Sequence, residues 1–382
     1  MNQTTPKPSR GYTGSTPTQN APFGPIEKPK KKPKTHLPLL LDPFAQKVLL
    51  YDVLTQGLPK VPPAVSFAKS GKPSTDTRDP CDADWELGPA DQLVHLVPYP
   101  PMMDVILPKI KALLKEYSFD AQNLWLNRLT PESRLFHHPA QICSEHDTTD
   151  LVLGGLWRPS VAIVQYCKYG SIEPQLFPNV SSIGGTAPVP DLMLFNTPTD
   201  RERYVRAATG EIKTHSVLNV SIQEELAAIT ESWKGMPLGR SLRFFWPIKG
   251  ETNLPKLTKV IVQVWSQMVH HKVNYAMLSS YQCTYFFARR PEDQNTLFIS
   301  RAYSEQEAAA ATLAFTAVAL GELVKKEDFK LPPVSTKHWP AEGMQRPPGS
   351  GIHPATLPQA YRGETEKPRN RPTGFKDIDD FL

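Results

Sequence analysis

The clearest hydrophobic pattern in the chain predicts a long helix over residues 253–271. Apolar side chains recur there at the i, i+3, i+4, i+7 spacing of one helical face, namely Leu257, Val260, Ile261, Val264, Trp265 and Met268. A shorter helical pattern covers residues 221–233. A further helix should begin at Ser304 and run to about residue 323, because Glu307 completes a capping-box pattern three residues after the serine.

Weaker patterns in the first half of the chain predict more helix and one strand. We expect one short helix over residues 43–56 and little other structure before residue 100. An amphipathic helix is predicted over residues 105–117, and another over 145–157 with Ser144 as its N-cap. The β-branched, apolar run Val161–Tyr166 is typical of a strand.

Strand patterns are concentrated in the middle and C-terminal half of the chain. Short apolar runs at residues 275–279, 284–288 and 297–300 predict strands. The run Leu192–Phe195 is apolar at every position, as expected of a strand buried on both faces. Helices and strands that alternate in this way indicate an α/β (α+β) fold with a central mixed sheet flanked by helices.

The distribution of proline separates tails from the packed part. Of 40 prolines, twelve precede position 65 and nine follow position 330, whereas only four lie between positions 200 and 330. We therefore divide the chain into a disordered basic tail (1–36), an irregular and helical region (37–139), an α/β domain (140–325) and a disordered, Pro-rich tail (326–382).

The net charge and the cysteine content restrict the possible partners and the cellular compartment only slightly. A net charge of +5 permits binding to nucleic acid without requiring it. The four cysteines form no CxxC pair and no apolar run reaches eighteen residues, so we expect an intracellular protein without a membrane span. A basic run resembles a nuclear localisation signal or a phosphate-binding arm, with a solvated linker as the alternative; it comprises Lys28, Lys30, Lys31, Lys32 and Lys34.

Two of the predicted strands carry a set of residues suited to metal-assisted hydrolysis. Asp191 precedes the apolar run at 192–195, and Glu211-Ile212-Lys213 ends a second run some twenty residues later. Because side chains alternate along a strand, Glu211 and Lys213 should share one face and Ile212 the other. If the strands are neighbours, Asp191 and Glu211 can hold Mg²⁺ or Mn²⁺ together with the Ile212 carbonyl, and Lys213 can orient water or offset phosphate charge.

This order of elements and motifs resembles the PD-(D/E)XK nuclease superfamily, whose fold is restriction-endonuclease-like. The stretch Gly210–Thr214 and the downstream segments Val262–Trp265, Tyr275–Tyr281 and Thr284–Arg289 are similar, more narrowly, to an expanded group of fungal proteins. Some members of that group carry a kinase-like domain. The resemblance covers about residues 140–323.

The resemblance implies a nuclease that acts on DNA or RNA with Mg²⁺ or Mn²⁺. It makes Asp191 and Glu211 metal ligands and Lys213 the catalytic lysine, and it suggests Glu145 and Gln263 as accessory residues. An alternative is a non-catalytic interaction module with the same fold and a kinase-like partner, because a fold can persist after its activity is lost.

Overall fold

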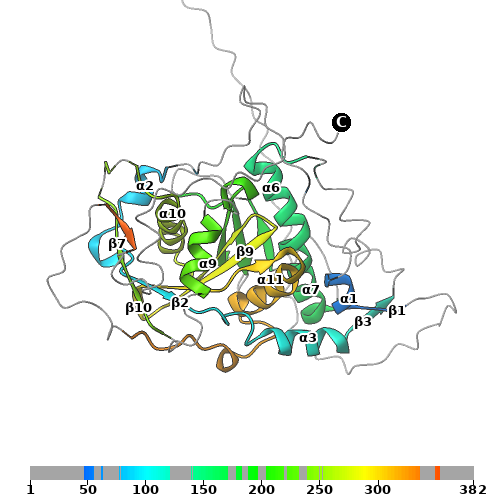
Figure 1. Ribbon diagram of the computed structural model, residues 1–382. Coiled ribbons are helices and arrows are strands. Elements are labelled where there is room, and N and C mark those ends of the chain that lie inside the picture. Colours follow the sequence, from blue (N-terminus) through cyan, green and yellow to red (C-terminus); the bar gives the residue numbers. More distant parts are fainter. Residues whose placement is uncertain are drawn as a thin grey trace, which may run out of the picture. The chain divides into compact units, whose positions relative to one another are not determined.

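A ten-stranded mixed sheet organises the protein, as seen in the computed structural model (Figure 1). The structure describes residues 47–55, 79–120, 141–170, 178–182, 188–196, 204–218, 222–231, 239–248, 250–251, 253–335 and 349–352, with the single positions 62, 77 and 139. The basic run at residues 28–34 lies outside these residues.

The strands pair in the order β12-β7-β2-β10-β9-β8-β6-β5-β4, and β11 pairs with β9. The pairs β6–β8 and β2–β10 are parallel and the other pairs are antiparallel, so the sheet is mixed. The strands of this sheet are β2 (His95–Pro98), β4 (Asn179–Ser181), β5 (Leu192–Asn196), β6 (Val205–Ile212), β7 (Leu242–Phe245), β8 (Tyr275–Ser279), β9 (Cys283–Arg290), β10 (Asp293–Ile299), β11 (Tyr303–Ser304) and β12 (Gly351–Ile352). A separate antiparallel pair joins β1 (Lys47–Leu49) and β3 (Ser118–Asp120).

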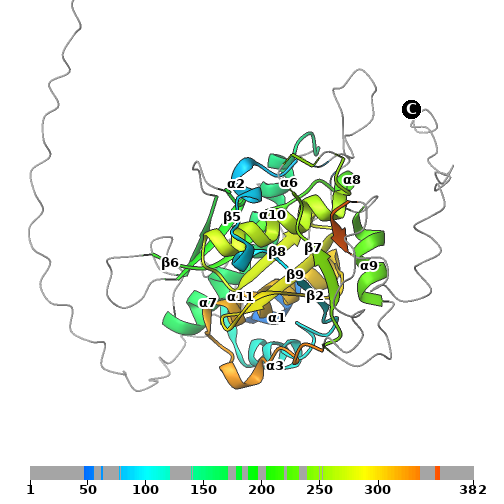
Figure 2. The ribbon, with the colours of Figure 1, turned by 90° about the vertical axis from the view of Figure 1, so that its left-hand side faces the viewer.

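Helices cover both faces of the sheet (Figure 2). One face carries α1 (Leu50–Thr55), α3 (Leu107–Glu116), α7 (Arg158–Tyr169) and α11 (Glu305–Leu320). The other carries α9 (Gln223–Glu231) and α10 (Lys256–His270). The remaining helical segments of the described residues are α2 (Asp82–Trp85), α6 (Glu145–Val152), α8 (His215–Val217), the 3₁₀ turns at Pro89–Asp91 and Lys326–Asp328, and the π-helical segment η2 (Leu153–Trp157).

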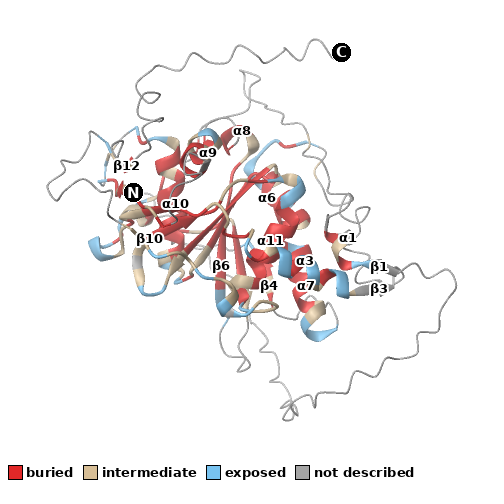
Figure 3. Ribbon diagram, turned by 60° about the horizontal axis from the view of Figure 1, so that its bottom comes forward, coloured by how far each residue is buried: buried red, intermediate tan, exposed pale blue. Residues whose placement is uncertain are grey.

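Alternation along the strands divides the buried side chains between two hydrophobic cores. In β9, Phe286 belongs to the core under α11, whereas its neighbours Tyr285 and Phe287 belong to the core under α10. Burial follows the same division, with buried strands between two helical layers (Figure 3). A sheet buried on both faces explains why its strands are apolar at successive positions.

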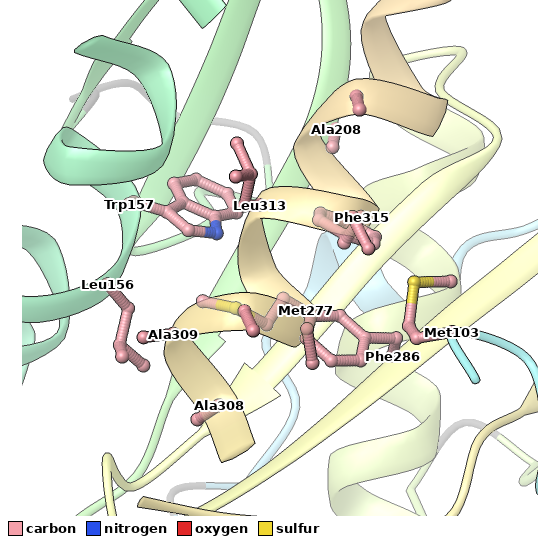
Figure 4. Close-up of a cluster of buried hydrophobic side chains, with 14 of the residues drawn as sticks. Met103, Leu156, Trp157, Ala208, Met277, Phe286, Ala308, Ala309, Leu313 and Phe315 are labelled. Carbon is pink, nitrogen blue, oxygen red and sulfur yellow. The ribbon is translucent and has the colours of Figure 1, made fainter. Parts of the chain in front are cut away.

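Helix α11 is buried on every side, which its small residues make possible. Ala308, Ala309 and Phe315 pack with Trp157 and Phe286 between the sheet and the outer helices (Figure 4). The Phe286 and Phe315 rings lie with their centroids 4.9 Å apart. The predicted capping box at Ser304 and Glu307 is confirmed at the start of this helix.

Most predicted helices and strands are confirmed. The helix predicted over residues 43–56 is confirmed for Leu50–Thr55, whereas Lys47–Leu49 form strand β1. One prediction is wrong. Residues 161–166 form part of helix α7 and not a strand. The β-branched residues that suggested a strand lie in a helix that is buried from Pro159 to Gln165, so apolar residues occupy all its sides and no helical period is visible. With α6 and η2, this helix makes a continuous helical run from Glu145 to Tyr169.

The N-terminal region holds more structure than predicted, and it joins the same body. Strand β2 lies between β7 and β10, and the residues from Ala45 onward form one compact unit. The described residues of the predicted ranges 37–139 and 140–325 therefore belong to one unit. Part of the predicted C-terminal tail also packs, since Leu331 and Val334 contact a core and β12 pairs with β7.

The described part of the chain contains no candidate for a membrane-spanning helix. None of the described helices is both long and apolar enough to cross a bilayer.

Candidate active site

The pairing of β5 with β6 brings the predicted carboxylates to one place. The strands are antiparallel, with Leu192 opposite Gly210, so Asp191 reaches the level of Glu211. The Ile212 N–H donates a hydrogen bond of 2.7 Å to Asp191 Oδ2. Gly210 permits the close packing of this strand, because a Cβ there would lie 3.2 Å from both Leu192 and Trp157.

Lys213 lies between two carboxylates. Its ammonium is 2.5 Å from Glu211 Oε1 and 2.8 Å from Glu145 Oε1. The Lys213 side chain is 5% exposed and that of Glu211 7%, whereas Glu145 is 44% exposed. Two of the three charges in this triad are therefore held out of water, where their attraction is strong.

Alternation places these side chains as predicted. Ile212 points into the core beneath α7 and α11, while Glu211 lies on the opposite face, where it contacts α10. The prediction that Glu211 and Lys213 share one face is confirmed by their direct contact.

Asp191, Glu211, Lys213 and Glu145 form one cluster of charged side chains, to which α6 contributes its first residue, Glu145. Ser144 caps this helix: its Oγ accepts from the Asp147 N–H, and its own N–H donates to Asp147 Oδ2 at 2.8 Å. The predicted N-cap is thus confirmed, and the cap fixes the backbone immediately before Glu145. Of the two accessory residues, Glu145 joins the cluster through Lys213.

The glutamine that contacts the cluster is Gln267, which is not among the site residues predicted from the sequence. Its Nε2 donates to Glu211 Oε2 at 2.6 Å, so both oxygens of Glu211 are hydrogen-bonded within the protein. Gln263 lies one turn earlier on α10 and is likewise buried. The spacing of four residues between the two glutamines was the available signal, since it places them on one helix face.

The electrostatics of the cluster raise the pKa values of two of its members, Asp191 and Lys213. Burial raises the pKa of the Asp191 carboxyl to about 8, and the negative charge of Glu211 adds to the effect. Burial alone would lower the pKa of Lys213, but attraction to Glu211 and Glu145 outweighs it and holds that pKa above its usual range. Lys213 therefore stays protonated at neutral pH, while Asp191 is easily protonated.

The donor set is chemically suited to a divalent cation. Asp191, Glu211 and Glu145 with Lys213 carry a formal charge of −2 when all are ionised, three negative charges against one positive. A divalent cation between Asp191 and Glu211 would remove the repulsion that opposes ionisation of Asp191. The Ile212 carbonyl stays a predicted ligand, since the contact of Ile212 with Asp191 is made by its N–H.

The protein alone would supply few ligands. In the described ranges, no group of three or more His, Cys, Asp or Glu side chains is arranged to hold a metal ion. A site built on Asp191 and Glu211 would therefore rely on waters for the remaining positions. That arrangement is ordinary for Mg²⁺, which keeps several waters and often binds one or two carboxylates.

Comparisons with known proteins bring no match: no protein-family model, curated protein or solved structure corresponds to this chain. The proposed function below is therefore based on the cluster of Asp191, Glu211, Lys213 and Glu145.

Proposed function

We propose that the protein is a metal-dependent hydrolase of nucleic-acid phosphodiesters, of the PD-(D/E)XK type. The observation that carries the proposal is the pair of contacts from Lys213 to Glu211 and Glu145, with Asp191 tied to the adjacent peptide. Structural ion pairs also perturb pKa values, but a carboxyl group with a raised pKa beside a buried lysine is typical of functional sites.

In the proposed reaction, a water oxygen bonds to phosphorus, the bond from phosphorus to the leaving sugar oxygen breaks, and one water proton ends on that oxygen. Mg²⁺ or Mn²⁺ bound at Asp191 and Glu211 would supply Lewis acidity and make water more acidic. Lys213 is a poor base because it stays protonated. Its ammonium instead stabilises negative charge that develops on the phosphate oxygens.

The other two residues position these groups. Glu145 holds the Lys213 ammonium from the exposed side of the cluster, and Gln267 fixes the Glu211 carboxylate from α10. Residues held by such hydrogen bonds need little reorganisation during the reaction.

Cleavage of DNA and RNA by the purified full chain tests this proposal. We expect strand cleavage with Mg²⁺ or Mn²⁺, none in EDTA, and a loss of about a hundredfold or more in Glu211→Gln and Lys213→Met, by analogy with removal of an electrostatic stabiliser. The exposed Glu116 provides a matched control, Glu116→Gln, that should keep full activity. Metal-independent cleavage, or cleavage that survives both site variants, would contradict the assignment.

A second candidate function is a non-catalytic interaction module, and one observation favours it. Both oxygens of Glu211 already have partners within the protein, Lys213 and Gln267, so the cluster is neutralised in part by its own lysine. Titration calorimetry separates the two functions. Binding of Mn²⁺ that disappears in Glu211→Gln supports the hydrolase, whereas the absence of any binding supports the module.

A further inference from the structure

A cavity of about 510 Å³ lies away from the carboxylate–lysine cluster. It forms where the C-terminal end of α10, the turn between β9 and β10, and residues 86–91 meet, and it contains no residue of that cluster. Its volume is in the range of sites that bind small molecules, about 300–1,000 Å³. Its charged lining consists of Lys272, Arg289, Arg290, Glu86 and Asp91.

Arg289 presents an arginine fork to this cavity that is fixed at one end. Its Nε donates to the Val273 carbonyl at 2.8 Å, and its guanidinium carbon lies 5.8 Å from the centroid of the Trp265 ring. Among the described residues, its terminal nitrogens have no hydrogen-bond partner. A guanidinium held in this way is preorganised to bind an oxyanion through two parallel hydrogen bonds.

Arg290 has a different role, because its Nη2 donates to the carbonyls of Leu331 and Pro332. It ties the segment after α11 to the sheet. The two cations available to a ligand are therefore Arg289 and Lys272, whose ammonium has no ion-pair partner in the described part of the chain.

The backbone at Lys272 is of a kind that normally selects glycine. Its φ is 55°, and it occupies the left-handed position of a Schellman motif, in which the Val273 N–H bonds the Met268 carbonyl and its own N–H bonds the Val269 carbonyl. Glycine adopts this conformation without the cost that a side chain incurs. A lysine here gives up stability and places an ammonium at the cavity.

The acidic residues define the ligand further. Glu86 and Asp91 share the lining with the cations, so a ligand should carry hydrogen-bond donors as well as an anionic group. A phosphate suits the two cations better than a carboxylate, because it offers three oxygens and up to two charges to a fork and an ammonium.

We propose that this cavity is a binding site for a phosphate-bearing ligand of about mononucleotide size, held by Lys272 and Arg289. The ligand has two sources with this chemistry, a free nucleotide and a phosphate of a nucleic-acid strand. The site is separate from the proposed catalytic cluster, and its occupancy does not require hydrolysis.

Titration calorimetry of the full chain in EDTA tests the site with inorganic phosphate, adenosine monophosphate and a single-stranded oligonucleotide. The variants are Lys272→Gly and Arg289→Gln, with the exposed Lys111→Gln and Arg158→Gln as matched controls. Each site variant should weaken binding about tenfold or more, because a charge-assisted hydrogen bond contributes at least that factor. The controls should bind as the wild type does.

Lys272→Gly separates binding from folding. It should leave the melting temperature unchanged or raise it, since glycine suits the backbone there, and it should still weaken ligand binding. Weakened binding of adenosine monophosphate and phosphate identifies free nucleotides as the ligand, and weakened binding of the oligonucleotide alone identifies a strand phosphate. No binding of any probe, or binding that both site variants leave intact, overturns the proposal.

Discussion

At the scale of single residues, the Lys213 ammonium holds two carboxylates together, the buried Glu211 and the more exposed Glu145. It contacts Glu211 and Glu145, and it lowers the cost of ionising Asp191. Removal of one partner from a buried ion pair leaves the others uncompensated, which costs about 3–5 kcal/mol. The stability of the domain should therefore depend on this lysine whether or not the site is catalytic.

We expect Lys213→Met to lower the free energy of unfolding by about 3 kcal/mol near neutral pH, because the variant leaves the Glu211 and Glu145 carboxylates without their cation. Denaturant unfolding followed by circular dichroism measures the loss. Lys111→Met, at an exposed position, should have no effect. Equal stability of the two variants would mean that the carboxylates do not depend on Lys213.

The raised pKa of Asp191 predicts that the stability of the folded protein depends on pH. Its pKa in the folded protein, about 8, lies above the ordinary value near 4, so the folded state binds more protons between these limits. Stability should then fall as the pH rises from about 4 to about 8, and level off above that.

Asp191→Asn removes this titration and can still accept the Ile212 hydrogen bond. In EDTA it should be more stable than the wild type at about pH 8, by about 1–3 kcal/mol, and the difference should vanish towards about pH 4. Melting curves across this range measure it, with the exposed Asp82→Asn as control. A variant that is less stable at about pH 8 would show that Asp191 is not strained by its neighbours.

At the scale of elements, the helical run from Glu145 to Tyr169 carries one of the cluster's acids. The run changes to π-helix at η2, where Gly155 faces the Tyr281 ring. A Cβ at Gly155 would lie 2.6 Å from a Tyr281 ring carbon, closer than real Cβ atoms approach. Gly155 therefore allows this helix to approach the loop between β8 and β9.

Gly155→Ala should lower the free energy of unfolding by about 1–3 kcal/mol, the usual cost of overpacking a core. Differential scanning calorimetry should show the loss as a reduced melting temperature. Gly88→Ala is the matched control, because its nearest non-neighbour atom would be 3.9 Å away. If the two variants melt together, the packing at Tyr281 adapts without cost.

The sequence predicts those helices that carry polar residues at helical spacing or a capping signal at their start, and fails where neither is present. Helix α10 shows its apolar stripe because its other face carries Gln263 and Gln267, and Ser304 marks the start of α11. Helix α7 is buried from Pro159 to Gln165, and its β-branched, apolar run at residues 161–166 wrongly predicts a strand. Strand β2 has only four residues and ends in Pro98, so its place in the sheet depends on its partners β7 and β10.

For the candidate site, strand alternation predicts that Glu211 and Lys213 share one face, where the structure brings them into contact, and the predicted N-cap at Ser144 places Glu145 at a helix start. The contact of Gln267 with Glu211 depends on how α10 lies across β6, which no local pattern specifies. Long-range packing therefore decides which of two equivalent glutamines meets the carboxylate.

At the scale of the whole molecule, residues before and after position 140 share one sheet. Strand β2 connects β7 to β10, and Arg301, which follows β10, binds Asp104 through two hydrogen bonds of 2.9 and 3.0 Å. A fragment that starts at residue 140 would expose the edges of β7 and β10. Unpaired strand edges promote association between chains.

We therefore expect a fragment of residues 140–382 to aggregate or to lack a cooperative thermal transition, whereas a fragment of residues 45–382 should melt as the full chain does. Circular dichroism and size-exclusion chromatography distinguish the two. A cooperative, monomeric 140–382 fragment would show that the first part of the chain is dispensable for the fold.

Metal binding between Asp191 and Glu211 is tested by anomalous diffraction from crystals of the full chain soaked in Mn²⁺. We expect a manganese peak between the carboxylates of Asp191 and Glu211, about 2 Å from an oxygen of each, as is usual for a small hard cation. The peak should be absent in crystals of Glu211→Gln. An undisturbed contact between Lys213 and Glu211 at saturating Mn²⁺, with no peak beside it, would contradict a metal-dependent hydrolase and leave the interaction module.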